Sequence, residues 1–318
     1  MSAPEILVIG SGAVGAVFAA HLEAAGCNVT FLVRDPDGPN ARMPRRLHHY
    51  RPGRSTVTTT QNLPCVTSAG GRWDQAWLCL PSTALETDWL AQRLAELDTR
   101  TPLVSWTPDV RDRERLEARY QGPIVPGLIG FLAYQSPLPG TDLDADGFGY
   151  LLPPLASAML ERSDEGRRAA GWLRKGGLPT RMVADLPWTA ARGAAVLITT
   201  VAALELSEWS FSGLRKSEHF RLGQQAAQEA IQATAVARGH GPGIARRLPL
   251  GLMLRGFLAL APVFSPVPLE AYFRFHFIKV GDQTRMMLDS WRSLAREQGC
   301  DTPALDALRE ALGEAVVQ

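Results

Sequence analysis

Hydrophobic and polar positions follow two different periods at the start of the chain. Residues 6–9 form a short apolar run with β-branched side chains, which is typical of a buried parallel strand. Residues 13–25 place apolar side chains at helical spacing, and Gly26 follows as a stop signal. Residues 28–33 repeat the strand pattern. The order of strand, helix and strand predicts a βαβ unit.

The alternation continues through the first half of the chain. We expect strands at 73–80, 103–106 and 124–125, and helices at 84–97 and 111–120. Residues 35–55 are rich in Pro, Gly and Arg, and predict an irregular excursion near the adenosine end of a cofactor. Residues 127–185 are expected to hold the last strands and one helix near 165–174. Alternating strands and helices imply right-handed crossovers and a mostly parallel sheet.

The pattern becomes helical throughout after residue 185. We expect helices at 187–209, 215–238, 250–261, 281–297 and 303–316. The prediction is therefore an α/β Rossmann-type N-terminal domain with a mostly parallel sheet, residues 1–185. An all-α C-terminal domain for substrate binding or dimerisation follows at residues 186–318. A chain of 318 residues with 46% hydrophobic residues is long enough for two such domains.

Glycines punctuate the first strand-to-helix junction, which reads Gly10-Ser11-Gly12-Ala13-Val14-Gly15. Gly10 suits a tight turn, Gly12 allows a pyrophosphate to approach the backbone, and Gly15 allows the helix to pack on the strand. Free N–H groups and the helix dipole favour an anion at this helix start. The junction predicts a dinucleotide site; the alternative is a tight turn without a ligand.

The end of the second strand bears on which dinucleotide binds. A carboxylate there would accept a hydrogen bond from the ribose 2′-OH of NAD, whereas an arginine accommodates the 2′-phosphate of NADP. The chain reads Val33-Arg34-Asp35, which favours NADP(H) through Arg34. A shift of one residue would place Asp35 there and reverse the choice to NAD, and Arg34 would then be a solvated loop residue.

The composition of the chain limits the classes of partner that it is expected to bind. A net charge of +1 and a pI near 7.8 argue against nucleic acid or an anionic membrane as partner. The four scattered cysteines predict neither a metal site nor disulfides. The first strand begins too early for a signal peptide, and the longest apolar stretch, 194–204, is too short to span a bilayer. We expect a cytoplasmic protein that acts on a small molecule.

The chain resembles the ketopantoate reductase (2-dehydropantoate 2-reductase) family. The resemblance lies in the opening ILVIGSGAVGAVFAAHLEAAGCNVTFLVRD, in Asp185-Leu-Pro-Trp188 before the helical domain, and in Gly299-Cys-Asp-Thr-Pro303 before the last helix. It implies NADPH-dependent reduction of a 2-oxo acid, in which a lysine protonates the developing alkoxide and a glutamate helps to hold the substrate. It also implies a homodimer at most, and places Leu80, Pro81 and Thr107 in loops against the cofactor.

The catalytic positions of that family are altered here. The lysine position is occupied by Ala190 and the asparagine position corresponds to Gly193. Gln283 stands where the family has a glutamate, while Pro81 and the stretch 106–108 replace a lysine and a Gln-Asn-Gly motif. Alanine cannot donate a proton and glutamine cannot supply the charge of a glutamate. These changes argue against ketopantoate as the substrate.

Three functions stay open at this point. One is an NADP(H)-dependent oxidoreductase that acts on another 2-oxo or 2-hydroxy acid or a related carbonyl. Its candidate groups are Lys279 as proton donor, Arg192 as carbonyl or carboxylate ligand, and Gln283; surface or interdomain ion pairs are the alternative for the two cations. The others are a non-catalytic NADP-binding protein and a ketopantoate reductase with substituted chemistry. The basic loop 238–247 could meet an anionic substrate or simply connect two helices.

Overall fold

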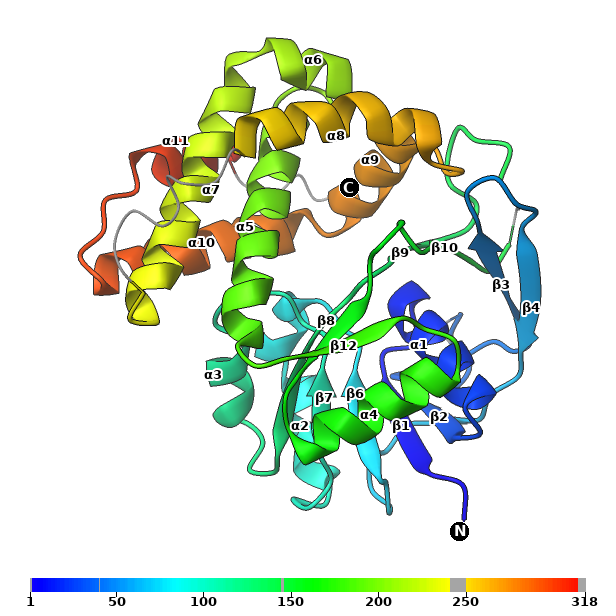
Figure 1. The fold of residues 1–318 in the computed structure, drawn as a ribbon. Helices are drawn as coiled ribbons and strands as arrows, with labels where there is room; N and C mark the ends of the chain where they lie inside the picture. Colours follow the sequence, from blue (N-terminus) through cyan, green and yellow to red (C-terminus); the bar gives the residue numbers. More distant parts are fainter. Residues whose placement is uncertain (1, 40, 144–145, 241–249, 314–318) are drawn as a thin grey trace. The chain divides into compact units, whose positions relative to one another are not determined.

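The computed structural model describes residues 2–39, 41–143, 146–240 and 250–313 (Figure 1). The chain divides into two compact units, Met1–Leu186 and Pro187–Gln318. The first unit contains the strands and the second consists of helices. The predicted fold class, a Rossmann-type α/β region followed by an all-helical region, is confirmed.

An eight-stranded sheet forms the centre of the first unit, in the order β12-β11-β8-β7-β6-β1-β2-β5. Its strands are β1 (Glu5–Ile9), β2 (Asn28–Leu32), β5 (Cys65–Val66), β6 (Gln75–Leu78), β7 (Leu103–Ser105), β8 (Ile124–Leu128), β11 (Ala158–Glu161) and β12 (Thr180–Val183). All neighbouring pairs are parallel except β8 with β11. The carboxyl ends of β1, β2, β6 and β7 therefore lie at one edge, where the predicted cofactor residues follow them.

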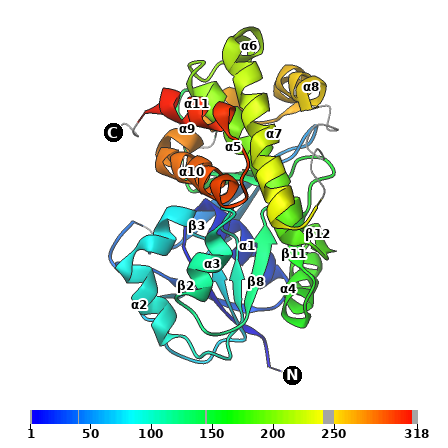
Figure 2. The ribbon, with the colours of Figure 1, turned by 90° about the vertical axis from the view of Figure 1, so that its left-hand side faces the viewer.

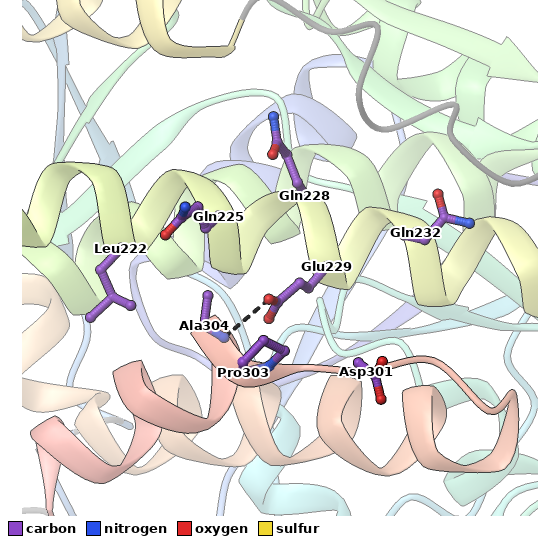
Figure 3. A pocket seen from close by; sticks show the side chains of 8 residues that line it. All are labelled: Leu222, Gln225, Gln228, Glu229, Gln232, Asp301, Pro303 and Ala304. Carbon is purple, nitrogen blue, oxygen red and sulfur yellow. Dashed lines mark hydrogen bonds between the residues drawn. The ribbon is translucent and has the colours of Figure 1, made fainter.

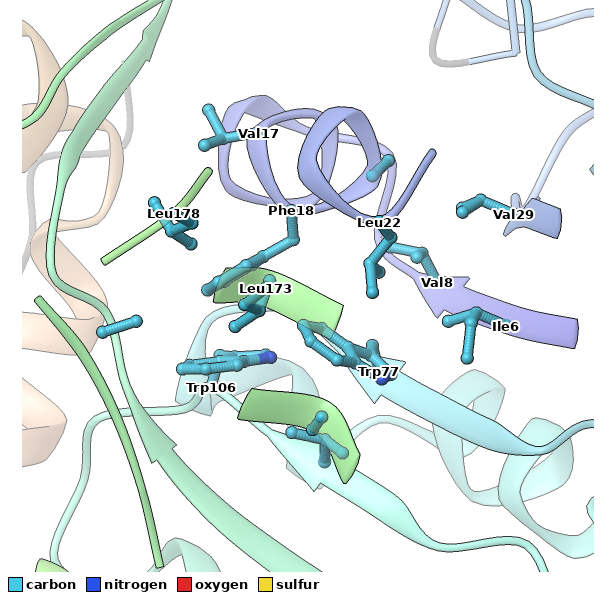
Figure 4. Close-up of a cluster of buried hydrophobic side chains, with 14 of the residues drawn as sticks. Ile6, Val8, Val17, Phe18, Leu22, Val29, Trp77, Trp106, Leu173 and Leu178 are labelled. Atoms are coloured by element: carbon cyan, nitrogen blue, oxygen red, sulfur yellow. The ribbon is translucent and has the colours of Figure 1, made fainter. Parts of the chain in front are cut away.

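Helices cover both faces of this sheet. One face carries α1 (Ala13–Ala24) and α4 (Asp164–Lys175), and the other carries η1 (Ser82–Glu86), α2 (Asp88–Glu96) and α3 (Asp112–Glu117). Phe18 of α1 stacks on Trp106 with ring centroids 4.1 Å apart and meets the edges of Trp77 and Phe131 (Figure 4). These buried aromatic contacts fix α1 over β6 and β7, because large rings bury much apolar area in defined geometries.

A second, four-stranded sheet contradicts the expectation that 35–55 is irregular. It runs β4-β3-β10-β9, from β3 (Arg45–Tyr50), β4 (Val57–Gln61), β9 (Leu132–Gln135) and β10 (Phe148–Leu151). The prediction was wrong because β3 reads Arg-Arg-Leu-His-His-Tyr, without a clear apolar alternation. Its pairing with β10, about a hundred residues away in sequence, buries Arg45 and His48 and makes it a strand. We call β4-β3-β10-β9 the accessory sheet; it packs against α1.

The second unit contains only helices among its described residues. They are α5 (Leu186–Glu205), α6 (Phe211–Lys216), α7 (Glu218–Ala237), α8 (Leu250–Phe264), α9 (Leu269–Lys279), α10 (Gly281–Glu297) and α11 (Pro303–Leu312). Helices α10 and α11 pack along α7 (Figure 2). The buried guanidinium of Arg285 joins three of them by donating to Glu205 at 2.7 Å and to the carbonyl of Leu312 at 3.0 Å.

Two differences from the sequence prediction concern this unit. Helix α9 was not predicted, because its aromatic-rich sequence has little polar–apolar periodicity. Helix α5, which contains the stretch 194–204, is 20 residues long, and by length and composition it could cross a membrane. The expectation that this stretch is too short therefore fails, although 61% of the apolar window is buried as in a core helix. Leu254–Phe264 and Leu269–Lys279 pass the same test only as a pair bent by 110°.

Two histidines lie between α1 and the accessory sheet. The His49 ring stacks on Tyr150 with centroids 4.3 Å apart, and His21 meets the same tyrosine edge-on. His21 Nδ1 donates to the carbonyl of Gly176 at 2.7 Å, so this nitrogen carries the proton of the neutral ring. Burial lowers the pKa of His21. Burial, repulsion from His21 if that ring were protonated, and the charge of Arg51 lower the pKa of His49 to about 4.

These shifts predict a loss of stability in mild acid. The folded state keeps both rings neutral, whereas the unfolded chain takes up protons once the pH falls below about 6.5. The free energy of unfolding should therefore be unaffected by these groups above pH 7 and decrease as the pH falls toward 4. For half-buried His49 we expect about 1–2 kcal/mol after allowance for solvent screening. Urea unfolding at pH 7.5 and 5.0 measures this, and His49→Gln should reduce the difference; an unchanged difference would contradict the assignment.

Candidate dinucleotide-binding site

The glycine junction between β1 and α1 is built by close backbone contacts. Gly10 has φ +111°, and a Cβ placed there would lie 2.7 Å from the carbonyl oxygen of Cys79 in the loop after β6. A Cβ on Gly15 would collide with the carbonyl oxygen of Gly10. These two positions therefore require glycine for packing, since a side chain would push α1 away from the strand.

Gly12 differs, because a Cβ there would meet nothing within 4 Å. It is the N-cap residue of α1, with φ −74° and ψ −171°, and no side chain caps this helix start. Ser11 before it is buried, while Ala13 and Val14 in the first turn are half-buried. The first N–H groups of α1 thus lie beside open space, which is the arrangement that binds phosphate in Rossmann-type turns.

Arg34 and Asp35 follow β2 and are both exposed. The Arg34 guanidinium lies over the ring of Trp89 in α2, with its Cζ 4.9 Å from the ring centroid. Asp35 instead bends back on its own loop, where Oδ1 accepts a hydrogen bond from the backbone N–H of Asp37 at 3.0 Å. The cation is therefore held above an aromatic face, while the carboxylate is engaged in a turn.

The accessory sheet contacts the same junction through two buried polar residues that sequence reasoning missed. Arg45 Nη1 donates to the carbonyl oxygen of Ser11 at 2.6 Å, and Gln61 Nε2 donates to the carbonyl oxygen of Ala16 at 3.0 Å. Both side chains come from strands that the sequence pattern did not predict. No local signal marks them, since their role depends on a sheet assembled from distant segments.

The remaining predicted cofactor residues lie in the loops after β6 and β7. Leu80 is half-buried and touches Gly10, Pro81 is exposed before η1, and Thr107 is half-buried after β7. The Thr107 hydroxyl lies 2.8 Å from that of Ser105. The structure brings these loops to the same sheet edge as the glycine junction, as the strand order requires.

A buried polar network ties these two loops together. Asp112 Oδ2 accepts hydrogen bonds from Ser82 Oγ at 2.6 Å and from the backbone N–H of Asp109 at 2.9 Å. The Arg115 guanidinium forms ion pairs with the carboxylates of Asp109 and Asp112, each at 3.0 Å. Burial raises the pKa of Asp112, and the hydrogen bonds from Ser82, Asp109 and Thr107 oppose that shift. The network therefore holds η1 against α3 just behind Pro81 and Thr107.

Residues 6–140 match the family model for ketopantoate reductase PanE/ApbA. Over these residues, the chain is similar to ketopantoate reductases. The match spans the glycine junction and the loops after β2, β6 and β7. A comparison with curated protein sequences finds no match.

Solved structures share the fold over almost the whole chain. A PanE/ApbA family ketopantoate reductase from Ralstonia eutropha JMP134 superposes with a TM-score of 0.74 at 13% identity, over 97% of both chains. D-mandelate dehydrogenase, solved with NADH and anilino(oxo)acetate, superposes with a TM-score of 0.74 at 16% identity, over 97% of this chain and 96% of that one. A dimeric ketopantoate reductase from Staphylococcus aureus superposes with a TM-score of 0.70 at 14% identity, over 97% of both chains. At these identities the likeness establishes the fold.

The catalytic candidates from the sequence lie on three helices of the second unit. Arg192 of α5 is half-buried over Trp188, with its Cζ 4.9 Å from the ring centroid, and its buried Nε has no hydrogen-bond partner in the described structure. Lys279 is exposed at the end of α9, and Gln283 is half-buried in the first turns of α10. Ala190 and Gly193 lie on α5 beside Arg192.

No group of three or more His, Cys, Asp or Glu side chains that could hold a metal ion occurs among the described residues. The four cysteines carry free thiols, and burial raises the pKa of the Cys27 thiol to about 11. Most of the basic loop 238–247 lies outside the described residues, which resume at 250.

A polar groove of about 560 Å³ in the second unit lies between α7 and the start of α11 (Figure 3). Gln225, Gln228, Gln232 and Glu229 are among the residues that line it. The Glu229 carboxylate accepts hydrogen bonds from the N–H groups of Ala304 at 3.0 Å and Leu305 at 2.8 Å. This carboxylate caps α11, which gives it a structural role.

The contrast between Gly10 and Gly12 predicts a difference in stability. Gly10→Ala should lower the free energy of unfolding by at least about 2 kcal/mol, because it combines a positive φ with a backbone clash. Gly12→Ala should stay within about 1 kcal/mol of the wild type, because its φ is ordinary and its surroundings are open. Urea unfolding of both variants without cofactor checks this. Equal losses in the two variants would contradict the geometry described for the junction.

Proposed function

We propose that the protein is an NADP(H)-dependent oxidoreductase that reduces a 2-oxo acid, or a related carbonyl compound, other than ketopantoate. The observation that carries the proposal is the glycine junction, where the uncapped start of α1 lies beside open space at Gly12. The match of residues 6–140 to the ketopantoate reductase family model supports a nicotinamide cofactor at this junction. We also expect at most a homodimer; one structural relative is described as dimeric.

The choice of NADP(H) over NAD(H) rests on Arg34. Its guanidinium is held over Trp89 at the end of β2, where a 2′-phosphate on the adenosine ribose would lie. Asp35 is the residue that would favour NAD(H), but its Oδ1 is already engaged by the N–H of Asp37. A planar, charged guanidinium suits a phosphate, since it can donate two parallel hydrogen bonds.

The proposed substrate class, a 2-oxo acid, rests on the guanidinium of Arg192 on α5. Reduction transfers hydride from the dihydronicotinamide to the carbonyl carbon and a proton to the carbonyl oxygen. Arg192, stacked on Trp188, suits the carboxylate of a 2-oxo acid, because a guanidinium binds carboxylates well but holds its own proton at neutral pH. The relative D-mandelate dehydrogenase was solved with a 2-oxo compound, anilino(oxo)acetate, which supports this class. Lys279 is the candidate proton donor, and Gln283 would contribute hydrogen bonds.

A second function, a non-catalytic NADP-binding protein, is favoured by a different observation. The family's lysine position is Ala190, which offers no proton, and Lys279 is exposed at its helix end. A chain that kept the cofactor scaffold and lost its acid would have this arrangement. Cofactor binding without turnover across a broad panel of 2-oxo acids would support this second function over the first.

The cofactor proposal predicts that Arg34→Ala removes a preference for NADPH. The wild type should bind NADPH more tightly than NADH, and the variant should bind NADPH about 10- to 100-fold more weakly with NADH affinity unchanged. Arg54→Ala, which alters an exposed arginine at the turn between β3 and β4, is the matched control and should change neither affinity. Fluorescence titration measures all of these values. Equal wild-type affinities for the two cofactors would refute the preference.

The substrate proposal predicts a separation of kinetic effects. For a 2-oxo acid that the wild type reduces, Arg192→Met should raise KM at least about tenfold by removing the carboxylate ligand, with NADPH affinity unchanged. Lys279→Ala should lower kcat about 100-fold or more if Lys279 is the proton donor. Initial rates of NADPH oxidation measure both. Unchanged KM in Arg192→Met, or unchanged kcat in Lys279→Ala, would remove that residue from its proposed role.

A further inference from the structure

Arg45 lies directly against the glycine junction, although it belongs to the accessory sheet. It is the first residue of β3, it is 9% exposed, and its Nη1 donates to the carbonyl oxygen of Ser11 at 2.6 Å. Its guanidinium lies over two aromatic rings, 5.0 Å from the centroid of Phe31 and 5.5 Å from that of Phe148. Two rings and one carbonyl thus fix the position of this cation.

The hydrogen bond to Ser11 also determines where the next amide points. The Ser11 carbonyl and the Gly12 N–H belong to one planar trans peptide, so they point in opposite directions. Because Arg45 holds the carbonyl, the Gly12 N–H is directed away from Arg45. Open space surrounds the missing side chain of Gly12. An amide directed away from Arg45, beside this open space at the start of α1, is the donor that a phosphate oxygen needs.

The charge of Arg45 adds to this orientation. A cation near a helix N-terminus opposes the positive end of the helix dipole, and burial away from water raises that cost. Burial indeed lowers the pKa of Arg45, while the neighbouring Cys65 thiol raises it. An anion bound at the junction would offset both unfavourable effects. The donated hydrogen bond also polarises the Ser11–Gly12 peptide, which makes its N–H a better donor.

We propose that Arg45 is a positioning residue for the pyrophosphate of the dinucleotide: it orients the Gly12 N–H and supplies a buried positive charge beneath the junction. This inference rests on the proposed dinucleotide binding. It gives the accessory sheet a role in cofactor affinity, because the sheet carries Arg45 into place.

The test compares Arg45→Met with Arg45→Gln, which keeps an N–H donor but no charge, and with Arg46→Met as matched control. Arg46 is the next residue of β3, its side chain is 63% exposed, and it lies 3.9 Å from the Asp146 carboxylate. The probes are NADPH, 2′-phospho-ADP-ribose, which keeps the pyrophosphate, and 2′-AMP, which lacks it. Calorimetric titration at one fixed ionic strength gives the three affinities, and urea unfolding gives the stability of each variant.

We expect Arg45→Met to lower the affinities for NADPH and 2′-phospho-ADP-ribose by about 10- to 100-fold. Its affinity for 2′-AMP should stay within about twofold of the wild-type value. Arg45→Gln should lie between Arg45→Met and the wild type, and Arg46→Met should match the wild type. Unchanged NADPH affinity in Arg45→Met would overturn the inference. An equal loss for all three ligands would also overturn it, because it would indicate only a structural role.

Two further outcomes keep the test decisive. If Arg45→Met does not fold, Arg45→Gln replaces it, and an unchanged ratio of 2′-phospho-ADP-ribose to 2′-AMP affinity in that variant would overturn the inference. If the wild type binds neither NADPH nor 2′-phospho-ADP-ribose, the proposed function fails, and the inference fails with it. If the wild type binds NADPH and 2′-phospho-ADP-ribose and an Arg45 variant binds them with the same affinities, the role of Arg45 is contradicted while the proposed function stands.

Discussion

The close approach of α1 to β1 is the constraint on which the first unit depends. Gly15 lies against the carbonyl of Gly10, and Gly10 in turn lies against the backbone of Cys79, so three segments meet without side chains between them. This contact sets the height of α1 above the sheet. At that height Phe18 reaches Trp77 and Trp106, and the accessory sheet packs against the same helix. The packing of the unit and the open helix start therefore have one cause.

The accessory sheet also holds the glycine junction in its conformation. Arg45 and Gln61 donate to backbone carbonyls at Ser11 and Ala16, on either side of the start of α1. A backbone carbonyl held by a buried donor cannot rotate without the cost of leaving that donor unsatisfied. The conformation of the junction is thus fixed both by glycine packing from the sheet below and by side chains from a second sheet. Such preorganisation lowers the ordering cost of binding a ligand there.

The sequence predicted the parts whose signals are local. The strand at 6–9, the fingerprint from Gly10 to Gly15 and the helical second half depend on neighbouring residues, and the structure has these elements. Strand β3 and helix α9 could not be predicted in this way, because a polar or aromatic-rich segment takes its conformation from distant partners. For the same reason Arg34 was recognised as a candidate from its position alone, whereas Arg45 was not. Its significance lies in a pairing of β3 with β10 that no short-range pattern encodes.

In the proposed function, cofactor binding and chemistry are separable for a physical reason. In that function, backbone N–H groups and arginines of the first unit would hold the dinucleotide, and none of these contacts needs the proton donor. General acid catalysis contributes about 10²- to 10⁴-fold to a rate, which corresponds to about 3–6 kcal/mol in the transition state alone. An alanine where the resembled family has its lysine, as proposed for Ala190, would therefore lower the rate and leave cofactor affinity unchanged. Hydride transfer itself is the chemistry of the nicotinamide. A scaffold with this junction can thus keep its cofactor while its substrate, its proton donor or its entire reaction changes.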